Sequence, residues 1–168
     1  MGFLELSRRL NALNNNLLAT YISEILNQDS VVLEELQKDQ LYAGQTAEGK
    51  TLAPSYYADP FFKSPISAAK YARYKDRIIA RAHNPIFAPK QYETPNLIVT
   101  GRLVYDTIFA RVNGNQSLTI DANSPILGKL LAKYKEPFGL NQTAWDYYTK
   151  EHLVPKLTVK VRNYLYQQ

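Results

Sequence analysis

The sequence has 168 residues, a net charge of +5 at pH 7 and no cysteine. A chain of this length is expected to form one domain with its own core, and the lack of cysteine excludes disulfides, thiolate metal sites and cysteine nucleophiles. No apolar run reaches the length of a membrane span, and the first residues lack the bases of a signal peptide, so we expect a protein made in the cytoplasm that contacts no membrane.

Tyrosine is the unusual part of the composition, with 13 residues against one tryptophan and one methionine. Tyrosine combines a large ring with a polar tip, so it suits both the edge of a core and a protein–protein interface. The basic residues are spread along the chain and permit contact with nucleic acid or an acidic partner without requiring either.

The first part of the chain is expected to be helical. Residues 3–26 place apolar side chains at three- and four-residue spacing, which predicts an amphipathic helix, although three consecutive asparagines in it are poor helix formers. A break follows at 27–30, where Asp29 or Ser30 can cap a second helix over 31–42.

Residues 43–65 have no helical or strand period and are interrupted by glycines and prolines. Disordered segments are poor in aromatic residues, so this segment is predicted to be a long aromatic loop. Its rings exceed what a soluble monomer leaves in water, and the loop is expected to contact a partner and to be partly mobile in the isolated chain. The interface candidates in and beside it are Tyr42, Tyr56, Tyr57, Phe61 and Phe62.

A further helix is predicted over residues 66–79. Its basic residues are expected to be exposed, namely Lys70, Arg73, Lys75 and Arg77. Arg73 and Arg77 are interface candidates, and the basic face invites an alternative in which residues 66–81 bind DNA. A solvated helix face with its tyrosines turned inward is the simpler interpretation, since the overall charge is modest.

The next elements are predicted strands and a short helix. Residues 102–112 are rich in strand formers, and Asn113-Gly114-Asn115 signals a hairpin before residues 117–122. Residues 126–135 then predict a short helix.

Asn141 is a plausible N-cap for the last helix, which runs to about Tyr166. Leu140 and Trp145 have the spacing of a hydrophobic staple across that cap. Pro155 is expected to kink or restart the helix.

One motif suggests chemistry. Residues 44–51 match the phosphate-binding loop G-x-x-x-x-G-K-[ST], which in a true site follows a buried strand and opens a helix. Here a predicted amphipathic helix precedes the motif, and Pro54 follows it within three residues. The match is therefore interpreted as a fortuitous turn formed with Gly44, Gly49, Lys50 and Thr51.

No other pattern of reactive residues indicates catalysis. His83 and His152 have no partner at metal-ligand spacing, and no serine stands in the strand–turn–helix of a nucleophile. We therefore expect no metal, no cofactor and no enzymatic activity. A nucleotide hydrolase using Lys50 and Thr51 stays as a remote alternative.

Several short motifs carry a family resemblance. The sequence has Gln40-Leu41-Tyr42-x-Gly44, Gly49-Lys50-x-Leu52-x-Pro54-x-Tyr56, Tyr71-x-x-Tyr74-Lys75, Asn96-Leu97-x-x-Thr100-Gly101 and Phe138-Gly139-Leu140-Asn141. In their order and spacing these resemble small tail-completion and head–tail joining proteins of tailed phages, especially those of Bacteroidetes hosts, the crAss-like phages included. The sequence departs from the wider family at Leu52-Ala53, where a tryptophan commonly stands before the first proline.

The resemblance implies a structural protein of the virion, without catalysis or cofactor, at the head–tail junction or in the tail. It implies a ring of identical copies that binds portal, connector or other tail proteins, with possible contact to packaged DNA. A DNA-binding accessory protein remains the alternative function, with Lys70, Arg73, Arg77 and Arg81 as its contacts.

The expected fold is α+β, with N- and C-terminal amphipathic helices packed on a small antiparallel sheet and a long aromatic loop. The single domain, 1–168, divides into a helical region (1–43), a loop–helix–loop region (44–95) and a region of sheet, short helix and C-terminal helix (96–168).

Overall fold

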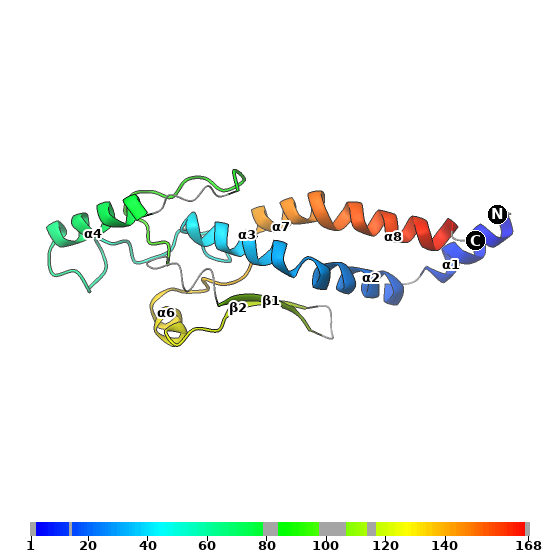
Figure 1. Ribbon diagram of the computed structural model, residues 1–168, viewed down its shortest axis with the longest axis horizontal. Helices are drawn as coiled ribbons and strands as arrows, with labels where there is room; N and C mark the ends of the chain where they lie inside the picture. The colour runs from blue at the N-terminus through cyan, green and yellow to red at the C-terminus, as the bar shows by residue number, and fades with distance from the viewer. Residues whose placement is uncertain (1–2, 14, 79–83, 98–106, 114–116, 167–168) are drawn as a thin grey trace.

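The computed structural model describes residues 3–13, 15–78, 84–97, 107–113 and 117–166 (Figure 1). Its elements, in chain order, are α1 (Phe3–Ala12), α2 (Asn15–Gln28), α3 (Ser30–Tyr42), α4 (Pro65–Ile78), β1 (Ile108–Val112), β2 (Leu118–Ala122), α6 (Leu127–Lys133), α7 (Gln142–Tyr148), the π-helical turn η1 (Thr149–Leu153) and α8 (Val154–Tyr166). The predicted α+β class, with its small antiparallel sheet and aromatic loop, is confirmed.

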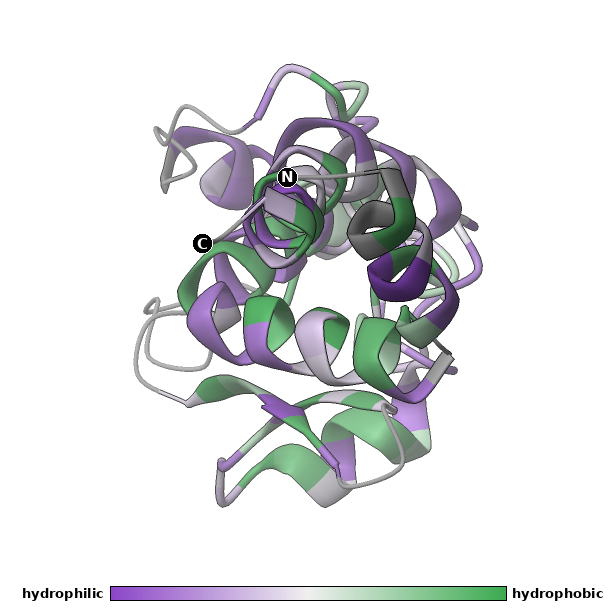
Figure 2. Cartoon of the chain, turned by 90° about the vertical axis from the view of Figure 1, so that its right-hand side faces the viewer, coloured by the Kyte–Doolittle hydropathy of each residue, from purple (hydrophilic) through white to green (hydrophobic). Residues whose placement is uncertain are grey.

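The molecule is elongated, and its long axis is set by helices. α2 and α3 follow one another along this axis, and α7 and α8 run beside them, so both termini lie at one end and α4 lies at the other (Figure 1). The β-hairpin forms a layer beneath the helices (Figure 2), where β1 contacts α3 and α2. α8 packs against α1 and α2.

The helix predicted over residues 3–26 is two helices. α1 ends at Ala12 and α2 begins at Asn15. Asparagine side chains compete for backbone hydrogen bonds and favour helix ends over helix interiors, so the asparagine run explains why the hydrophobic period continues while the helix stops.

Asp29 stands at the N-cap of α3, but its side chain makes no capping hydrogen bond, so the predicted capping role is wrong. The carboxylate is buried and accepts a hydrogen bond from the Tyr148 hydroxyl at 3.2 Å, and it pairs with Lys156. Asp29 therefore fixes the C-terminal helices against the junction of α2 and α3.

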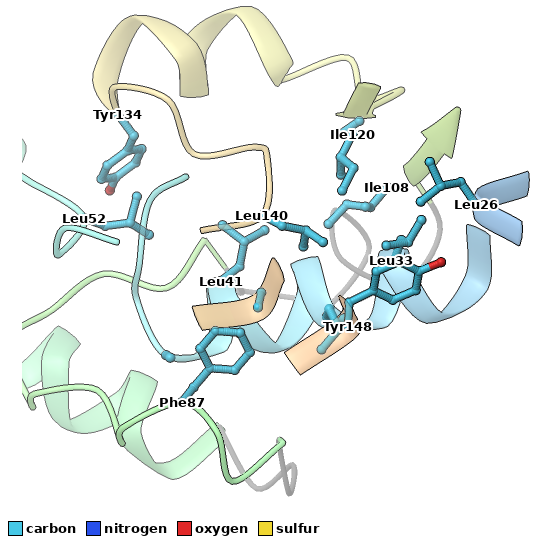
Figure 3. Close-up of a cluster of buried hydrophobic side chains, with 14 residues drawn as sticks. Leu26, Leu33, Leu41, Leu52, Phe87, Ile108, Ile120, Tyr134, Leu140 and Tyr148 are labelled. Atoms are coloured by element: carbon cyan, nitrogen blue, oxygen red, sulfur yellow. The ribbon is translucent and has the colours of Figure 1, made fainter. Parts of the chain in front are cut away.

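The main core lies where these helices meet the hairpin. Figure 3 shows Leu33 of α3 beside Ile108 of the hairpin and Tyr148 of α7, with Ile120 next to Ile108. Leu41 of α3 lies beside Leu140, and all of these side chains are buried. Full burial of each such aliphatic side chain contributes roughly 1.5–3 kcal/mol. The hairpin pairing runs from Ile108 opposite Ala122 to Val112 opposite Leu118. Residues 102–106 of the predicted strand, together with Gly114 and Asn115 of the predicted turn, lie outside the described residues.

Two buried glutamines of α3 hold the segment that leads into α7. Gln37 donates to the Pro137 carbonyl at 3.1 Å and accepts from the Gly139 N–H at 2.7 Å. Gln40 donates to the Gly139 carbonyl and accepts from the Asn141 N–H, both at 2.8 Å. Each amide thus satisfies one carbonyl and one N–H of a buried backbone, as burial requires. The motifs around Gln40 and Gly139 therefore meet in space.

The C-terminal helix begins and continues largely as predicted. The Asn141 side chain accepts from the Ala144 N–H at 3.0 Å, which confirms the N-cap. Proline has no N–H to donate and its ring crowds the preceding helical turn. The π-helical turn η1 lies directly before α8, and Pro155 falls in the first turn of α8, where the missing N–H costs least.

Candidate functional site

The glycine-rich segment 44–51 forms a tight turn. Gly44 and Gly49 both have positive φ, 70° and 74°. Gln45 and Thr51 form an isolated antiparallel bridge, and the Thr46 N–H donates to the Lys50 carbonyl at 2.8 Å. α3 precedes the turn, and residues 52–64, all of them described, form no helix. The helix N-terminus that would cradle a phosphate is therefore missing from this segment.

Lys50 of this motif is paired within its own turn. Its ammonium lies 2.5 Å from the Glu48 carboxylate. Their hydrogen bond and charge attraction raise the pKa of Lys50 and lower the pKa of Glu48. A carboxylate beside the lysine opposes phosphate at this position.

Some aromatic side chains in and beside the loop are buried, and others are exposed. Tyr42 and Tyr56 are buried, with 3% and 4% of their surface exposed, so in this structure neither interface candidate is available to a partner. Tyr57 and Phe61 point outward, with 46% and 78% exposed, and Phe62 is half-buried. The sequence could not separate these two sets, because the loop has no period from which to assign a face.

Phe61 and Phe62 form one wall of a groove whose other wall is α4. We name this the aromatic groove; it has a volume of about 570 Å³ and is lined by Phe61, Phe62, Lys63, Ser67, Lys70, Tyr71 and Tyr74. Phe62 packs on Phe61 edge to face at 5.2 Å and on Tyr71 at 5.2 Å, and Tyr71 lies 6.2 Å from Tyr74. The rings therefore form a continuous apolar surface across two segments.

Hydrogen bonds and an ion pair hold the loop that carries Phe61 against the rest of the chain. Asp59 is buried, pairs with Lys133 of α6, and accepts a hydrogen bond from the Phe61 N–H at 3.0 Å. The Tyr56 N–H donates to the Glu93 carbonyl at 3.0 Å. These bonds set the path of the loop, while its partial mobility in the isolated chain stays a prediction.

Burial keeps the tyrosines behind the groove uncharged. It raises the pKa of Tyr56 and Tyr71, and raises the pKa of Tyr134 to about 12. These hydroxyls stay protonated at physiological pH, so the wall of the groove carries no negative charge of its own.

The basic residues of α4 divide between surface and interior. Lys70, Arg73 and Arg77 are exposed as predicted, whereas Lys75 is 1% exposed, so its predicted exposure is wrong. Burial, and secondarily the charge of Lys90, lowers the pKa of Lys75 to about 8. Arg81 lies outside the described residues.

The net positive charge is concentrated in one segment of the sequence, contrary to the even spread expected. Residues 60–97 contain seven basic and two acidic residues, a net charge of +5, which equals that of the whole chain. The other 130 residues contain 13 of each sign and are neutral in sum. α4 lies at the end of the molecule opposite the termini (Figure 1), and it contains four of these seven basic residues and one of the two acidic ones.

Within the described part of the chain, no group of three or more His, Cys, Asp or Glu residues is placed to hold a metal ion. His152 stacks on the Tyr148 ring at 5.7 Å, and His83 lies outside the described residues. Among the helices described, none is long and apolar enough to cross a membrane.

No family model, curated protein or solved structure matches this chain significantly.

Proposed function

We propose that this chain is a non-enzymatic structural subunit of a tailed-phage particle, located at the head–tail junction or in the tail. In that role identical copies form a ring and bind portal, connector or other tail proteins. The motifs quoted above support this assignment by their order and spacing, and the aromatic groove is the structural observation that carries it.

The groove has the properties of a docking surface. Phe61 and Tyr74, which line the groove, are 78% and 50% exposed, and each large apolar side chain contributes roughly 1.5–3 kcal/mol when it is fully removed from water. Contiguous exposed apolar surface of this kind is typical of protein interaction sites. Asp59 and its partners hold the loop beside Phe61, which reduces the ordering entropy that is lost when a partner binds.

Assembly of particles tests the proposal. The variant Phe61→Ala with Tyr74→Ala removes two exposed rings that line the groove, and we expect it to fold normally but to be incorporated into particles several-fold less than the natural protein. Tyr56 is unsuitable for this test because its ring is buried. Purified particles from cells that supply only the variant would be compared by quantitative mass spectrometry.

The matched control is Val159→Ala with Tyr166→Ala, which removes two side chains on α8 that are 56% and 60% exposed. Normal incorporation of the Phe61 variant, or an equal loss in the control, would contradict a specific role for the groove.

A second candidate function is DNA binding by α4. The exposed side chains of Lys70, Arg73 and Arg77 favour it, and the burial of Lys75 weakens it. DNA binding predicts an affinity for duplex DNA that falls with salt, with a log–log slope of about −0.9 for each phosphate contacted. Reversing the charges of Lys70, Arg73 and Arg77 would then abolish DNA binding. A purely structural role predicts that the natural protein binds DNA only weakly and that the charge reversal does not affect particle assembly through loss of DNA binding.

A further inference from the structure

The aromatic groove lies in the part of the chain that carries all of the net positive charge. Lys63 and Lys70 line it directly, and the exposed Arg73 lies one helical turn from Lys70 on α4. None of the residues that line the groove is acidic. An apolar hollow with ammonium groups on its rim and no carboxylate in its wall is complementary to an apolar side chain flanked by negative charge.

The geometry of α4 makes this a defined surface. Ser67, Lys70, Tyr71 and Tyr74 follow one another at spacings of three, one and three residues, so they share one face of the helix. Phe61 and Phe62 face them from the loop. The groove therefore has a helical wall with one small residue, Ser67, and a loop wall made of rings.

We propose that the aromatic groove binds a segment of a partner protein that inserts an apolar side chain between Phe61 and Tyr74 and places carboxylates beside Lys63 and Lys70. This inference rests on the proposed function and adds the chemistry of the partner. It predicts that the partner's contact segment is acidic and apolar, and it assigns Lys63 and Lys70 to selection of the partner.

Nucleic acid fits this groove less well. Aromatic readers of single strands offer ring faces to successive bases, whereas Phe61, Phe62 and Tyr71 pack against one another here. Phosphate contacts need a row of basic groups, and the lining has two lysines separated by apolar rings.

Selection from a random-peptide display library on the immobilised full-length chain tests the proposal. We expect enriched peptides to combine Leu, Ile or an aromatic residue with neighbouring Asp or Glu, and to bind roughly tenfold or more weakly to Phe61→Ala with Tyr74→Ala. The variant Lys63→Glu with Lys70→Glu should instead enrich peptides with Lys or Arg at the same positions. Circular dichroism would confirm that each variant is folded.

The matched control is Lys150→Glu with Arg162→Glu, two exposed basic residues on η1 and α8. It changes the net charge equally, and it should enrich the same acidic peptides as the natural chain. A shift in this control would mean that total charge alone sets the preference, and would overturn the proposal.

Three further outcomes overturn it: no enrichment, enrichment without acidic residues, or peptides that bind the Phe61 variant equally well. The groove would be assigned to nucleic acid if a single-stranded or duplex oligonucleotide displaced the selected peptides from the natural chain and did not bind the variant Lys63→Glu with Lys70→Glu. The proposed function is tested separately, because loss of the Phe61 variant from particles does not depend on the charge of the partner.

Discussion

Lys75 is the least expected residue of the structure. Its side chain on α4 is 1% exposed, and on the same helix the Ala69 carbonyl accepts a hydrogen bond from the Tyr92 hydroxyl at 3.1 Å. The nearby Lys90 ammonium lies 3.9 Å from the Asp76 carboxylate. Burial disfavours the charged form of a lysine, which is why the pKa of Lys75 falls from 10.5 to about 8.

This shift makes stability depend on pH. Between pH 8 and 10.5 the unfolded chain binds more protons at this position than the folded chain, so the free energy of unfolding rises with pH. Tyrosines with raised pKa values, Tyr56, Tyr71 and Tyr134 among them, act in the opposite sense above pH 10, because their unfolded forms lose protons first. We therefore expect maximum stability near pH 10.

The variant Lys75→Met should be more stable than the natural protein at pH 7, by about 1–3 kcal/mol, because methionine fills a similar volume without a charge. It should also flatten the rise between pH 8 and 10. Urea unfolding at pH 7, 8, 9 and 10 measures both effects. Lys70→Met, at an exposed position of the same helix, should change neither. A loss of stability at pH 7 in Lys75→Met would mean that the ammonium is favourably paired.

At the scale of elements, hydrophobic period predicted the helices well. α3, α4 and α6 lie within one or two residues of the predicted ranges, and the Asn141 cap follows from its residue type. The hydrophobic period did not predict the break between α1 and α2 or the π-helical form of the turn before α8. Each feature depends on how local hydrogen bonding competes with packing.

The candidate site was predicted only in part. Tyr57, Phe61, Arg73 and Arg77 are exposed as an interface requires, but Tyr42 and Tyr56 are buried. A loop without a period gives no signal for the direction of its side chains. Tyr71 and Tyr74, which the simpler interpretation turned inward, line the groove, and Tyr74 is 50% exposed. Their three-residue spacing is the signal that could have placed them together on one helix face.

The two glycines of the turn at residues 44–51 allow a structural role of this segment to be tested against a phosphate-binding role. A Cβ at Gly44 would lie 2.5 Å from Thr94 Cγ2 and 2.8 Å from the Pro95 carbonyl oxygen, whereas the nearest atom at Gly49 is 3.8 Å away. Both glycines have positive φ, which costs other residues roughly 1–2 kcal/mol. Overpacking adds roughly 1–3 kcal/mol at Gly44 alone.

We therefore expect Gly44→Ala to destabilise the fold by about 2–5 kcal/mol and Gly49→Ala by about 1–2 kcal/mol. Thermal and urea unfolding of the two variants measure the difference. ATP should not shift the melting temperature of the natural protein, since a nucleotide bound to the folded state would raise it. A rise with ATP that is lost in Lys50→Ala would show that the turn binds nucleotide.

At the scale of the whole molecule, the fold separates a neutral body from a charged end. The helical layer and hairpin hold the core, while α4 and the aromatic loop lie at the far end from the termini (Figure 1). The net charge of residues 60–97 equals that of the entire chain. Under the proposed function, we expect the body to support the fold and the aromatic groove beside α4 to contact the partner.

We propose that the aromatic groove contacts another protein in assembled particles. A photo-crosslinking amino acid, p-benzoylphenylalanine, placed at Phe61 tests it directly, since the natural ring is already aromatic and 78% exposed. Particles that contain this variant would be irradiated, and the products identified by mass spectrometry. The same amino acid at Gln142, exposed at the start of α7, is the control. We expect a crosslink from position 61 to a different polypeptide or to a second copy of the chain. The crosslinked segment of that partner should contain apolar and acidic residues. The proposed contact would be contradicted if position 61 crosslinked only within its own subunit, or formed no crosslink in assembled particles.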